Sequence, residues 1–303
     1  MAGDRRQSTP VSRIGEIVRE RTYVIAEIGQ NHQGDLSIAR ELVRTAKLCG
    51  ADAVKSQKRD IRTLLTPEEY AKPYDSPHSF GKTYGEHREA LELSREAHAE
   101  LLAYANELGL EYFCSPWDVP SARLLHEIGT PLFKVPSAAL TQHALLRELA
   151  SYRKPIILST GMSTLDEIDA AVGVLSGAEL YLMQCTSAYP ATFDSINLRA
   201  VPTLAERYER PVGLSGHHKG IAVDAAAVAL GARLLERHFT LDRTWRGTDH
   251  AASLEPTGLS RLVRDVRAVE TSMGDGVKRL QECELASRAK LRGVRQQTKA
   301  EAA

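Results

Sequence analysis

The sequence predicts a single-domain (β/α)8 (TIM) barrel, the α/β fold in which eight parallel strands alternate with helices. Two observations predict it: short apolar runs alternate with amphipathic helical stretches, and there are eight such runs. Alternating strands and helices imply parallel strands with right-handed crossovers, and eight repeats in about 250 residues are typical of this barrel. A doubly wound open sheet is the alternative, but no G-x-G-x-x-G pattern follows the first run.

The runs expected to form strands are, in chain order, 23–28, 52–57, 110–115, 132–137, 155–160, 179–185, 211–215 and 233–239. Helix-like segments lie between them, for example LSIARELVRTAKLCG and SREAHAELLAYANELG. We expect residues 1–20 to be an N-terminal extension, residues 21–285 to form the barrel, and residues 286–303 to be a polar tail. A long insertion at 58–94 interrupts the alternation, and a loop of that length is usually functional.

Composition narrows the class of protein. Lys and Arg number 39 and so do Asp and Glu, so no basic excess points to nucleic acid. No apolar run approaches the roughly 20 residues of a membrane span, and the N-terminus lacks the apolar region of a secretory signal. The four cysteines form no C-x-x-C pair, which indicates buried free thiols. We therefore expect a cytoplasmic protein without nucleic-acid or membrane partners.

Two lysines lie inside apolar strands, Lys55 in AVKSQ and Lys134 in LFKVPS. An ammonium group at the edge of a barrel core needs a partner, because unpaired burial of a charge costs several kcal/mol. Reactive groups of such barrels gather at the carboxyl ends of the strands, where Ser and Thr hydroxyls also occur in this sequence. The pattern indicates a clamp for a phosphate or carboxylate.

Two histidines end consecutive strands, His217 and His238, and Asp249 follows in RGTDH. Adjacent strands lie about 4.8 Å apart, so side chains at their ends can share one ion. Imidazole pairs completed by carboxylate or water suit Mn²⁺, Fe²⁺ or Zn²⁺ better than Ca²⁺. Two protein nitrogens with open positions would make a Lewis acid and not a closed structural site.

Several strings, taken together, resemble sialic acid (N-acetylneuraminate) synthases and their 9-phosphate-forming relatives. They include YVIAEIGQNHQGDLSIARELVRTAKLCGADAVKSQK, GKTYGEHREALELS, LYLMQCTSAYP and ERHFTLDRTWRGTDHAASLEP, and the likeness runs from about residue 20 to 290. The resemblance implies a barrel enzyme that condenses phosphoenolpyruvate with the aldehyde of an open-chain sugar, releasing phosphate and forming a 3-deoxy-2-keto sugar acid.

The resemblance also implies residue roles. His217 and His238 would bind a divalent metal. We expect this metal to be Mn²⁺, with Mg²⁺, Co²⁺, Fe²⁺ or Zn²⁺ as alternatives. Phosphoenolpyruvate binding is expected at Lys55, Ser115, Lys134, Ser137, Ser159, Ser187, Ser215 and Lys278. The catalytic set around the metal and the acceptor sugar is expected to be Glu27, Gln57, Tyr189 and Asp249. The insertion itself, and not the resemblance, offers His78, Lys82, Tyr84 and His87 as candidate contacts to the acceptor sugar.

Two departures from the family pattern concern the acceptor. Relatives commonly read GSGE or GSGD after the strand-four lysine, whereas PSAAL places Ala139 at the acidic position. Many relatives continue into an antifreeze-like domain that lends an Arg to the partner's acceptor site in a homodimer, and this sequence does not extend that far. A homodimer is still the family expectation, and we expect N-acetylmannosamine to be a poor acceptor compared with another aldose.

Other functions stay open at this point. The same chemistry could act on a five- or six-carbon aldose without an N-acetyl group, or on a nucleoside-linked aldehyde. The chain could instead be an inactive barrel that serves as a binding subunit, although the set of His217, His238, Lys55 and Lys134 is complete. A Schiff-base aldolase is a third possibility. Such an aldolase needs no metal, so a chelator would leave it active and would inactivate a metal-dependent synthase.

Overall fold

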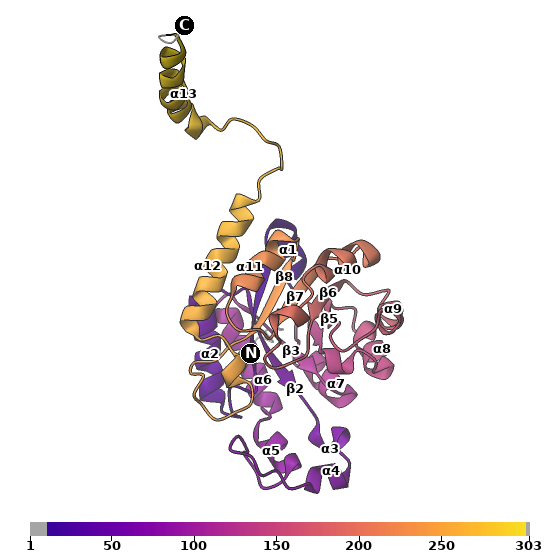
Figure 1. Ribbon diagram of the computed structural model, residues 1–303. Coiled ribbons are helices and arrows are strands. Elements are labelled where there is room, and N and C mark those ends of the chain that lie inside the picture. The colour runs from indigo at the N-terminus through magenta and orange to yellow at the C-terminus, as the bar shows by residue number, and fades with distance from the viewer. Residues whose placement is uncertain (1–10, 301–303) are drawn as a thin grey trace, which may run out of the picture. The chain divides into compact units, whose positions relative to one another are not determined.

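The computed structural model describes residues 11–300 and confirms the predicted barrel (Figure 1). Eight parallel strands close in chain order, and β1 pairs with both β2 and β8. The strands are β1 (Tyr23–Gly29), β2 (Ala53–Lys58), β3 (Glu111–Pro116), β4 (Phe133–Val135), β5 (Ile156–Ser159), β6 (Leu180–Cys185), β7 (Val212–Gly216) and β8 (Leu234–His238). Because all of them run the same way, their carboxyl ends meet at one rim.

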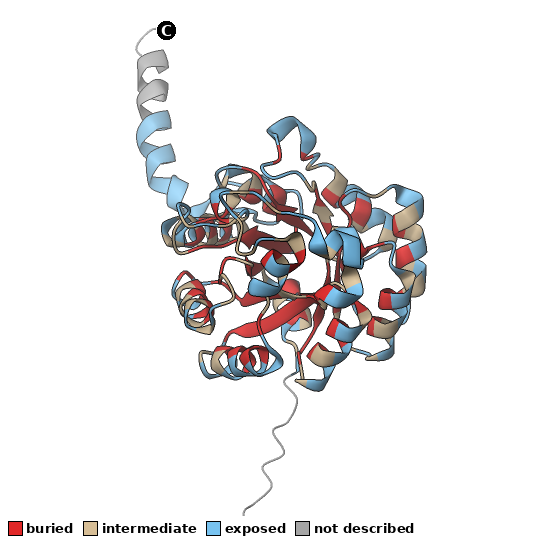
Figure 2. Ribbon diagram, turned by 90° about the horizontal axis from the view of Figure 1, so that it is seen from below, coloured by how far each residue is buried: buried red, intermediate tan, exposed pale blue. Residues whose placement is uncertain are grey.

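Helices cover the outside of the barrel, with buried faces toward the strands and exposed faces outward (Figure 2). They are α2 (Leu36–Leu48), α6 (Arg95–Glu107), α7 (Val119–Glu127), α8 (His143–Ser151), α9 (Leu165–Val174), α10 (Ala200–Tyr208), α11 (Ala222–Ala229) and α12 (Pro256–Ser272). Short 3-10 turns occur at η1 (Ser137–Ala139), η2 (Phe193–Ser195), η3 (His250–Ala252) and η4 (Glu282–Glu284). Among residues 11–300 no helix is long and apolar enough to cross a bilayer.

The interior of the barrel changes from apolar to polar along each strand. Side chains alternate between the two faces of a strand, so Tyr23, Ile25 and Glu27 share the inner face of β1. Tyr23 and Ile25 belong to a buried apolar cluster that fills the amino-terminal part of the barrel. Val24 and Ala26 instead join the larger cluster between the strands and the helices. Glu27 is thus the first inner residue of β1 beyond the apolar plug.

The amino-terminal end of the barrel is closed by a helix within the segment expected to be an extension. This helix, α1 (Ile14–Glu20), places Ile14 and Val18 in the interior cluster with Tyr23. Ile14 is fully buried. Residues 14–20 are therefore packed as part of the barrel unit.

The insertion after β2 folds into a small lobe of three helices, α3 (Ile61–Leu64), α4 (Pro67–Ala71) and α5 (Tyr84–Ala90) (Figure 1). Capping boxes begin α4 at Thr66 and α5 at Thr83. The lobe contacts the loop after β8, where the Arg246 guanidinium lies 4.0 Å from the centre of the Phe80 ring.

The chain divides into a barrel unit that ends at Glu270 and a second unit that begins at Thr271 and contains α13 (Leu285–Ala300). Three of the four free cysteines are buried as expected, namely Cys49, Cys114 and Cys185. Cys283 is exposed, contrary to the expectation, because it lies in η4 of the second unit.

Candidate active site

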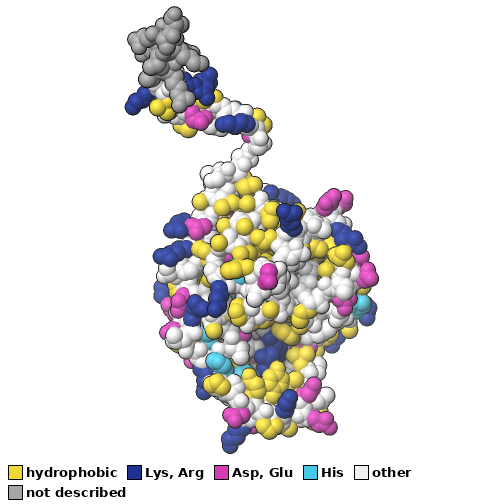
Figure 3. Space-filling view, viewed as in Figure 1, with side chains coloured by type: hydrophobic (Ala, Val, Ile, Leu, Met, Phe, Trp, Pro, Cys, Tyr) yellow, Lys and Arg dark blue, Asp and Glu magenta, His cyan; other side chains and the backbone are white. Residues whose placement is uncertain are grey.

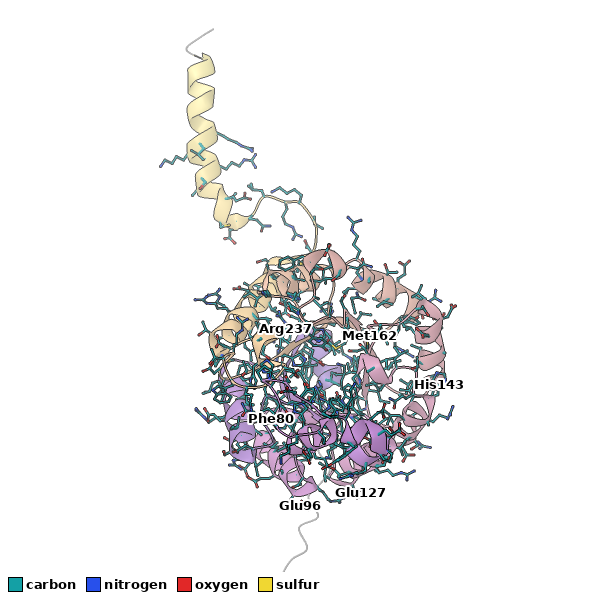
Figure 4. The ribbon with its side chains drawn as sticks, turned by 60° about the horizontal axis from the view of Figure 1, so that its bottom comes forward. Phe80, Glu96, Glu127, His143, Met162 and Arg237 are labelled. Carbon is teal, nitrogen blue, oxygen red and sulfur yellow. The ribbon has the colours of Figure 1, made fainter. Side chains whose placement is uncertain are left out.

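A cavity of about 210 Å³ opens at the carboxyl ends of the strands. Its lining contains these predicted residues: Glu27, Lys55, Gln57, Ser115, Lys134, Ser137, Ser159, Ser187, Tyr189, Ser215, His217 and His238. It also contains residues to which no role was assigned, including Trp117, Met162, Cys185 and Glu236. In Figure 4, Met162 and Arg237 lie toward the centre of the barrel end, whereas His143 and Glu127 lie at the periphery. The predicted positions converge because they occupy inner-face or rim positions of successive strands.

The two buried lysines are paired with carboxylates from β1 and β8. Lys55 Nζ lies 2.5 Å from Glu27 Oε2 and donates to Ser115 Oγ at 3.0 Å. Lys134 Nζ donates to Glu236 Oε2 at 2.8 Å, and Lys55 Nζ lies 3.9 Å from Glu236 Oε1. The sequence predicted that a bound anion would pair with these lysines, but carboxylates of the protein itself are their partners. Each ammonium group has three N–H donors, so donors remain for a ligand.

These ion pairs set the charge state of the cavity floor. Burial opposes the charge on Lys55, but Glu236 and Glu27 outweigh burial and raise its pKa. Burial likewise opposes the charge on Glu236, and Lys134 and Lys55 outweigh it and lower the pKa of that carboxyl. Lys55 and Glu236 are accordingly ionised at neutral pH.

Serine hydroxyls surround the lysines, and not all of them have protein partners. Ser137 Oγ accepts from the Gly161 amide at 3.0 Å, and Ser215 Oγ lies 3.5 Å from Glu236 Oε1. Ser159 Oγ is buried without a hydrogen-bond partner. A buried hydroxyl without a partner is costly, so a ligand that accepts from Ser159 would relieve that cost.

The two histidines face each other across β7 and β8. Their ring centres are 5.5 Å apart, and the Tyr189 ring lies 4.1 Å from that of His217. His217 Nδ1 donates to the Thr186 carbonyl at 3.0 Å, so a neutral His217 ring carries its lone pair on Nε2. Burial opposes the charge on this ring, but Cys185 outweighs burial and raises the pKa of His217. His238 Nδ1 is buried without a hydrogen bond, and Asp249 Oδ2 is 3.7 Å away.

The protonation of His238 is governed chiefly by burial, which lowers its pKa against the opposing effect of Asp249. A neutral imidazole with a free nitrogen is what a metal ligand requires. Within the described residues no three His, Cys, Asp or Glu side chains are arranged to hold a metal. The donor set thus fits an ion held by two imidazoles, with its other positions left to water or substrate.

A second cavity of about 300 Å³ adjoins the first and shares four lining residues with it, namely Gln57, Trp117, Tyr189 and His238. Its remaining lining is Gln30, Arg59, Arg88, Thr248 and Asp249. Asp249 is the member of the predicted catalytic set that lies here and not in the first cavity.

The acceptor contacts expected from the insertion are not at either cavity. Lys82 is exposed, and His87 is buried in the lobe, with its ring 4.6 Å from that of Tyr74. His78 Nδ1 accepts from the Gly247 amide at 3.2 Å, and Tyr84 faces a separate surface depression. Arg88, next to His87 on α5, lines the second cavity instead. The sequence analysis did not predict Arg88, although its position next to the predicted residue His87 could have indicated it.

Two further expected positions also lie away from the cavity walls. Ala139 is fully buried in the cluster between strands and helices, and its neighbour Ala138 lines the first cavity. No carboxylate therefore enters the cavity from η1. Lys278 lies in the second unit, where it is exposed, so its role stays a prediction.

Comparisons with known proteins agree with one another. The family model described as NeuB family matches residues 42–278. N-acetylneuraminate-9-phosphate synthases of Mus musculus and Homo sapiens are each 44% identical over 272 residues, covering 89% of this chain and 76% of theirs. An N,N'-diacetyllegionaminic acid synthase of Legionella pneumophila is 41% identical, covering 89% and 78%. The crystal structure of a sialic acid synthetase from Leptospira borgpetersenii has a TM-score of 0.77 at 31% identity, covering 90% of this chain and 93% of that one.

Proposed function

The chain belongs to the NeuB family, and we propose that it condenses phosphoenolpyruvate with the aldehyde of an open-chain sugar to form a 3-deoxy-2-keto sugar acid. The observation that carries this proposal is the first cavity, where Lys55 and Lys134 lie beside His217 and His238. Curated relatives named as synthases of three such acids, N-acetylneuraminic acid 9-phosphate, diacetyllegionaminic acid and pseudaminic acid, support it.

The reaction joins two carbons and cleaves a C–O bond. C3 of phosphoenolpyruvate attacks the aldehyde carbon, the aldehyde oxygen gains a proton, and positive charge develops at C2. Water then adds at C2, and phosphate leaves with its bridging oxygen. The spare N–H donors of Lys55 and Lys134 and the free hydroxyl of Ser159 hold the donor's anionic groups and meet the charge as it redistributes.

His217 and His238 would hold a divalent metal, for which we propose Mn²⁺, with Mg²⁺, Co²⁺, Fe²⁺ and Zn²⁺ as alternatives. When bound, such an ion supplies a Lewis acid that polarises the aldehyde. Tyr189 borders both histidines, and Asp249 lies on the acceptor side of His238. These two side chains orient the acceptor.

The lysine ion pairs favour this chemistry over a Schiff-base aldolase. A Schiff base forms from a neutral amine. Glu27 and Glu236 hold Lys55 in the charged state, and Lys134 donates directly to Glu236. Both lysines therefore form ion pairs with carboxylates, an arrangement that suits anion binding and not Schiff-base formation.

A phosphate-release assay with phosphoenolpyruvate, Mn²⁺ and a panel of aldoses tests the proposed function. We expect phosphate release that depends on both the aldose and the metal. Release of phosphate with no aldose present, or none with any aldose, contradicts the proposal. We also propose that the enzyme works in the cytoplasm as a homodimer, as the family resemblance implies, and light scattering of the purified protein measures the oligomeric state.

A further inference from the structure

We propose that Asn31 and Ser253 are positioning residues, which hold the Asp249 carboxylate in place for the acceptor sugar. This inference rests on the proposed function, in which Asp249 orients the acceptor, and it adds two residues to which no role was assigned. Neither of them lines the first or the second cavity. They belong to a chain of hydrogen bonds that links the turn after β1 to the loop after β8.

Asn31 lies in the turn that follows β1, in the string GQNHQGD, and is 1% exposed. Its backbone amide donates to the Ile28 carbonyl at 2.8 Å, which keeps the residue at the end of the strand. Its side-chain Nδ2 donates to the Phe239 carbonyl at 2.8 Å and to Ser253 Oγ at 2.9 Å. A carbonyl oxygen only accepts hydrogen bonds, so the nitrogen of the side-chain amide must face Phe239. Both N–H donors of this amide are thereby used.

Ser253 connects Asn31 to Asp249. Its side chain is buried, and its hydroxyl lies 2.7 Å from the Asp249 carbonyl. A hydroxyl has one hydrogen to donate, and this carbonyl can only accept, so Ser253 accepts from Asn31 and donates to Asp249. The Ala252 amide also donates to the Asp249 carbonyl, at a longer 3.3 Å. The chain of hydrogen bonds therefore runs in one direction, from Asn31 through Ser253 to the backbone of Asp249.

Backbone hydrogen bonds hold the two ends of the loop that contains Asp249. The Phe239 amide donates to the Glu27 carbonyl at 2.7 Å, and the Leu254 amide donates to the His238 carbonyl at 2.7 Å. Asp249 lies between these ends, so they do not fix its position by themselves. The buried chain from Asn31 reaches Asp249 from the side of the barrel.

The position of Asp249 matters because its carboxylate lies near both His238 and the second cavity. Its Oδ2 is 3.7 Å from His238 Nδ1, and the residue lines the second cavity. On its outer side the same loop meets the lobe, where the Gly247 amide donates to His78 Nδ1 at 3.2 Å. Figure 3 shows His side chains, in cyan, where the lobe meets the barrel. His78 is exposed, whereas Asn31 and Ser253 are buried. A displacement of about 1 Å in a site can cost roughly 100-fold in rate.

The test removes one link of the chain at a time and measures the reaction and the loop separately. Ser253→Ala deletes only the hydroxyl, and Asn31→Ala deletes both donors of the turn. We expect Ser253→Ala to lower kcat/KM about 3–10-fold for the aldose with the highest rate in the phosphate-release panel, the range for one neutral hydrogen bond. Asn31→Ala should lower it about tenfold or more, since it removes two such bonds. The dissociation constant of phosphoenolpyruvate should stay unchanged in both variants, because Lys55 and Lys134 lie in the first cavity.

Thr130→Val is the matched control. Thr130 is also buried, and its hydroxyl donates to one carbonyl, that of Leu132, at 3.1 Å. It precedes β4 and so lies at the amino-terminal end of the barrel. Thr130→Val should lower the free energy of unfolding about as much as Ser253→Ala does, and it should leave kcat/KM unchanged. Hydrogen exchange followed by mass spectrometry measures the loop directly. Ser253→Ala should speed exchange at residues 240–253, and Thr130→Val should not.

A lower kcat/KM together with faster exchange in the loop supports the inference. Unchanged kcat/KM in Ser253→Ala overturns it and leaves the proposed function intact. The inference is also overturned by an equal loss in Thr130→Val, by weaker binding of phosphoenolpyruvate in Ser253→Ala, or by a loss of kcat/KM without faster exchange in the loop. If Asn31→Ala does not fold, Ser253→Ala carries the test by itself. If the wild type turns over no aldose, the proposed function fails, and exchange then decides the inference: faster exchange at residues 240–253 in Ser253→Ala supports it, and unchanged exchange overturns it.

Discussion

Substitution of Lys134, alone and together with Glu236, should affect the free energy of unfolding and the catalytic activity differently. Lys134 and Glu236 are 3% and 6% exposed in their side chains and lie 2.8 Å apart. Lys134→Met leaves Glu236 with Lys55 at 3.9 Å as its remaining cation. Breaking a buried ion pair typically costs about 3–5 kcal/mol. Because Lys55 still compensates part of the charge, we expect a loss near the lower end, about 3 kcal/mol.

The double variant Lys134→Met/Glu236→Met should recover most of this stability. Apolar residues of similar volume often replace a buried ion pair without net cost. Catalysis should not recover, because the donor has lost a charge-assisted contact worth roughly 10–150-fold in kcat/KM for phosphoenolpyruvate. Urea denaturation followed by circular dichroism gives the free energy of unfolding, and the phosphate-release assay gives kcat/KM.

Two results would refute this reasoning. A loss below about 1 kcal/mol in Lys134→Met would place the pair among exposed salt bridges, which contribute that little. Donor kinetics unchanged in the stable double variant would assign the anion clamp to residues other than Lys134. Lys55→Ala serves as a second test of the clamp, with the same expected loss in kcat/KM for phosphoenolpyruvate.

Three further outcomes are expected. His238→Ala should lose both bound metal, measured by elemental analysis, and turnover; full activity in a chelator-treated, metal-free preparation would remove the Lewis acid from the mechanism. Gly161→Ala should raise the KM for phosphoenolpyruvate about tenfold or more, since a Cβ there would lie 2.5 Å from Ser187 Oγ and 2.7 Å from Ser137 Oγ, which displaces two hydroxyls each worth about 1 kcal/mol; an unchanged KM would show that the clamp does not use them. N-acetylmannosamine and its 6-phosphate should be poorer acceptors than another aldose with the same phosphorylation, because Ala139 supplies no carboxylate; a tenfold advantage for either N-acetylated sugar in kcat/KM would contradict this.

The arrangement of the barrel and of its inner rim could be predicted from the sequence. Alternating apolar runs and helices permit few topologies, and a closed parallel barrel brings the carboxyl ends of all strands together. Lys55, Lys134, His217 and His238 therefore had to converge, whatever the details of packing. The alternation of side chains between the two faces of a strand depends only on the local backbone, so it can be predicted without knowing the tertiary structure.

Partners separated by long stretches of chain were decided only by the tertiary structure. The sequence indicated that the lysines needed counter-charges, but the pairing of Lys134 with Glu236 joins residues 102 apart and depends on barrel closure. The same holds for α1, whose Ile14 and Val18 look like part of an extension until the open end of the barrel is there to receive them.

The insertion shows most clearly where sequence reasoning ends. Its function in the site was expected, yet the sequence could not say which face of α5 would meet the barrel. Neighbouring residues on a helix point about 100° apart, so His87 turns into the lobe while Arg88 reaches the second cavity. The sequence by itself determined the barrel fold and the side chains of the strands that meet at its rim. The docking of the lobe on the barrel, a long-range contact with no local signal, decided which side chain of the insertion lines the second cavity.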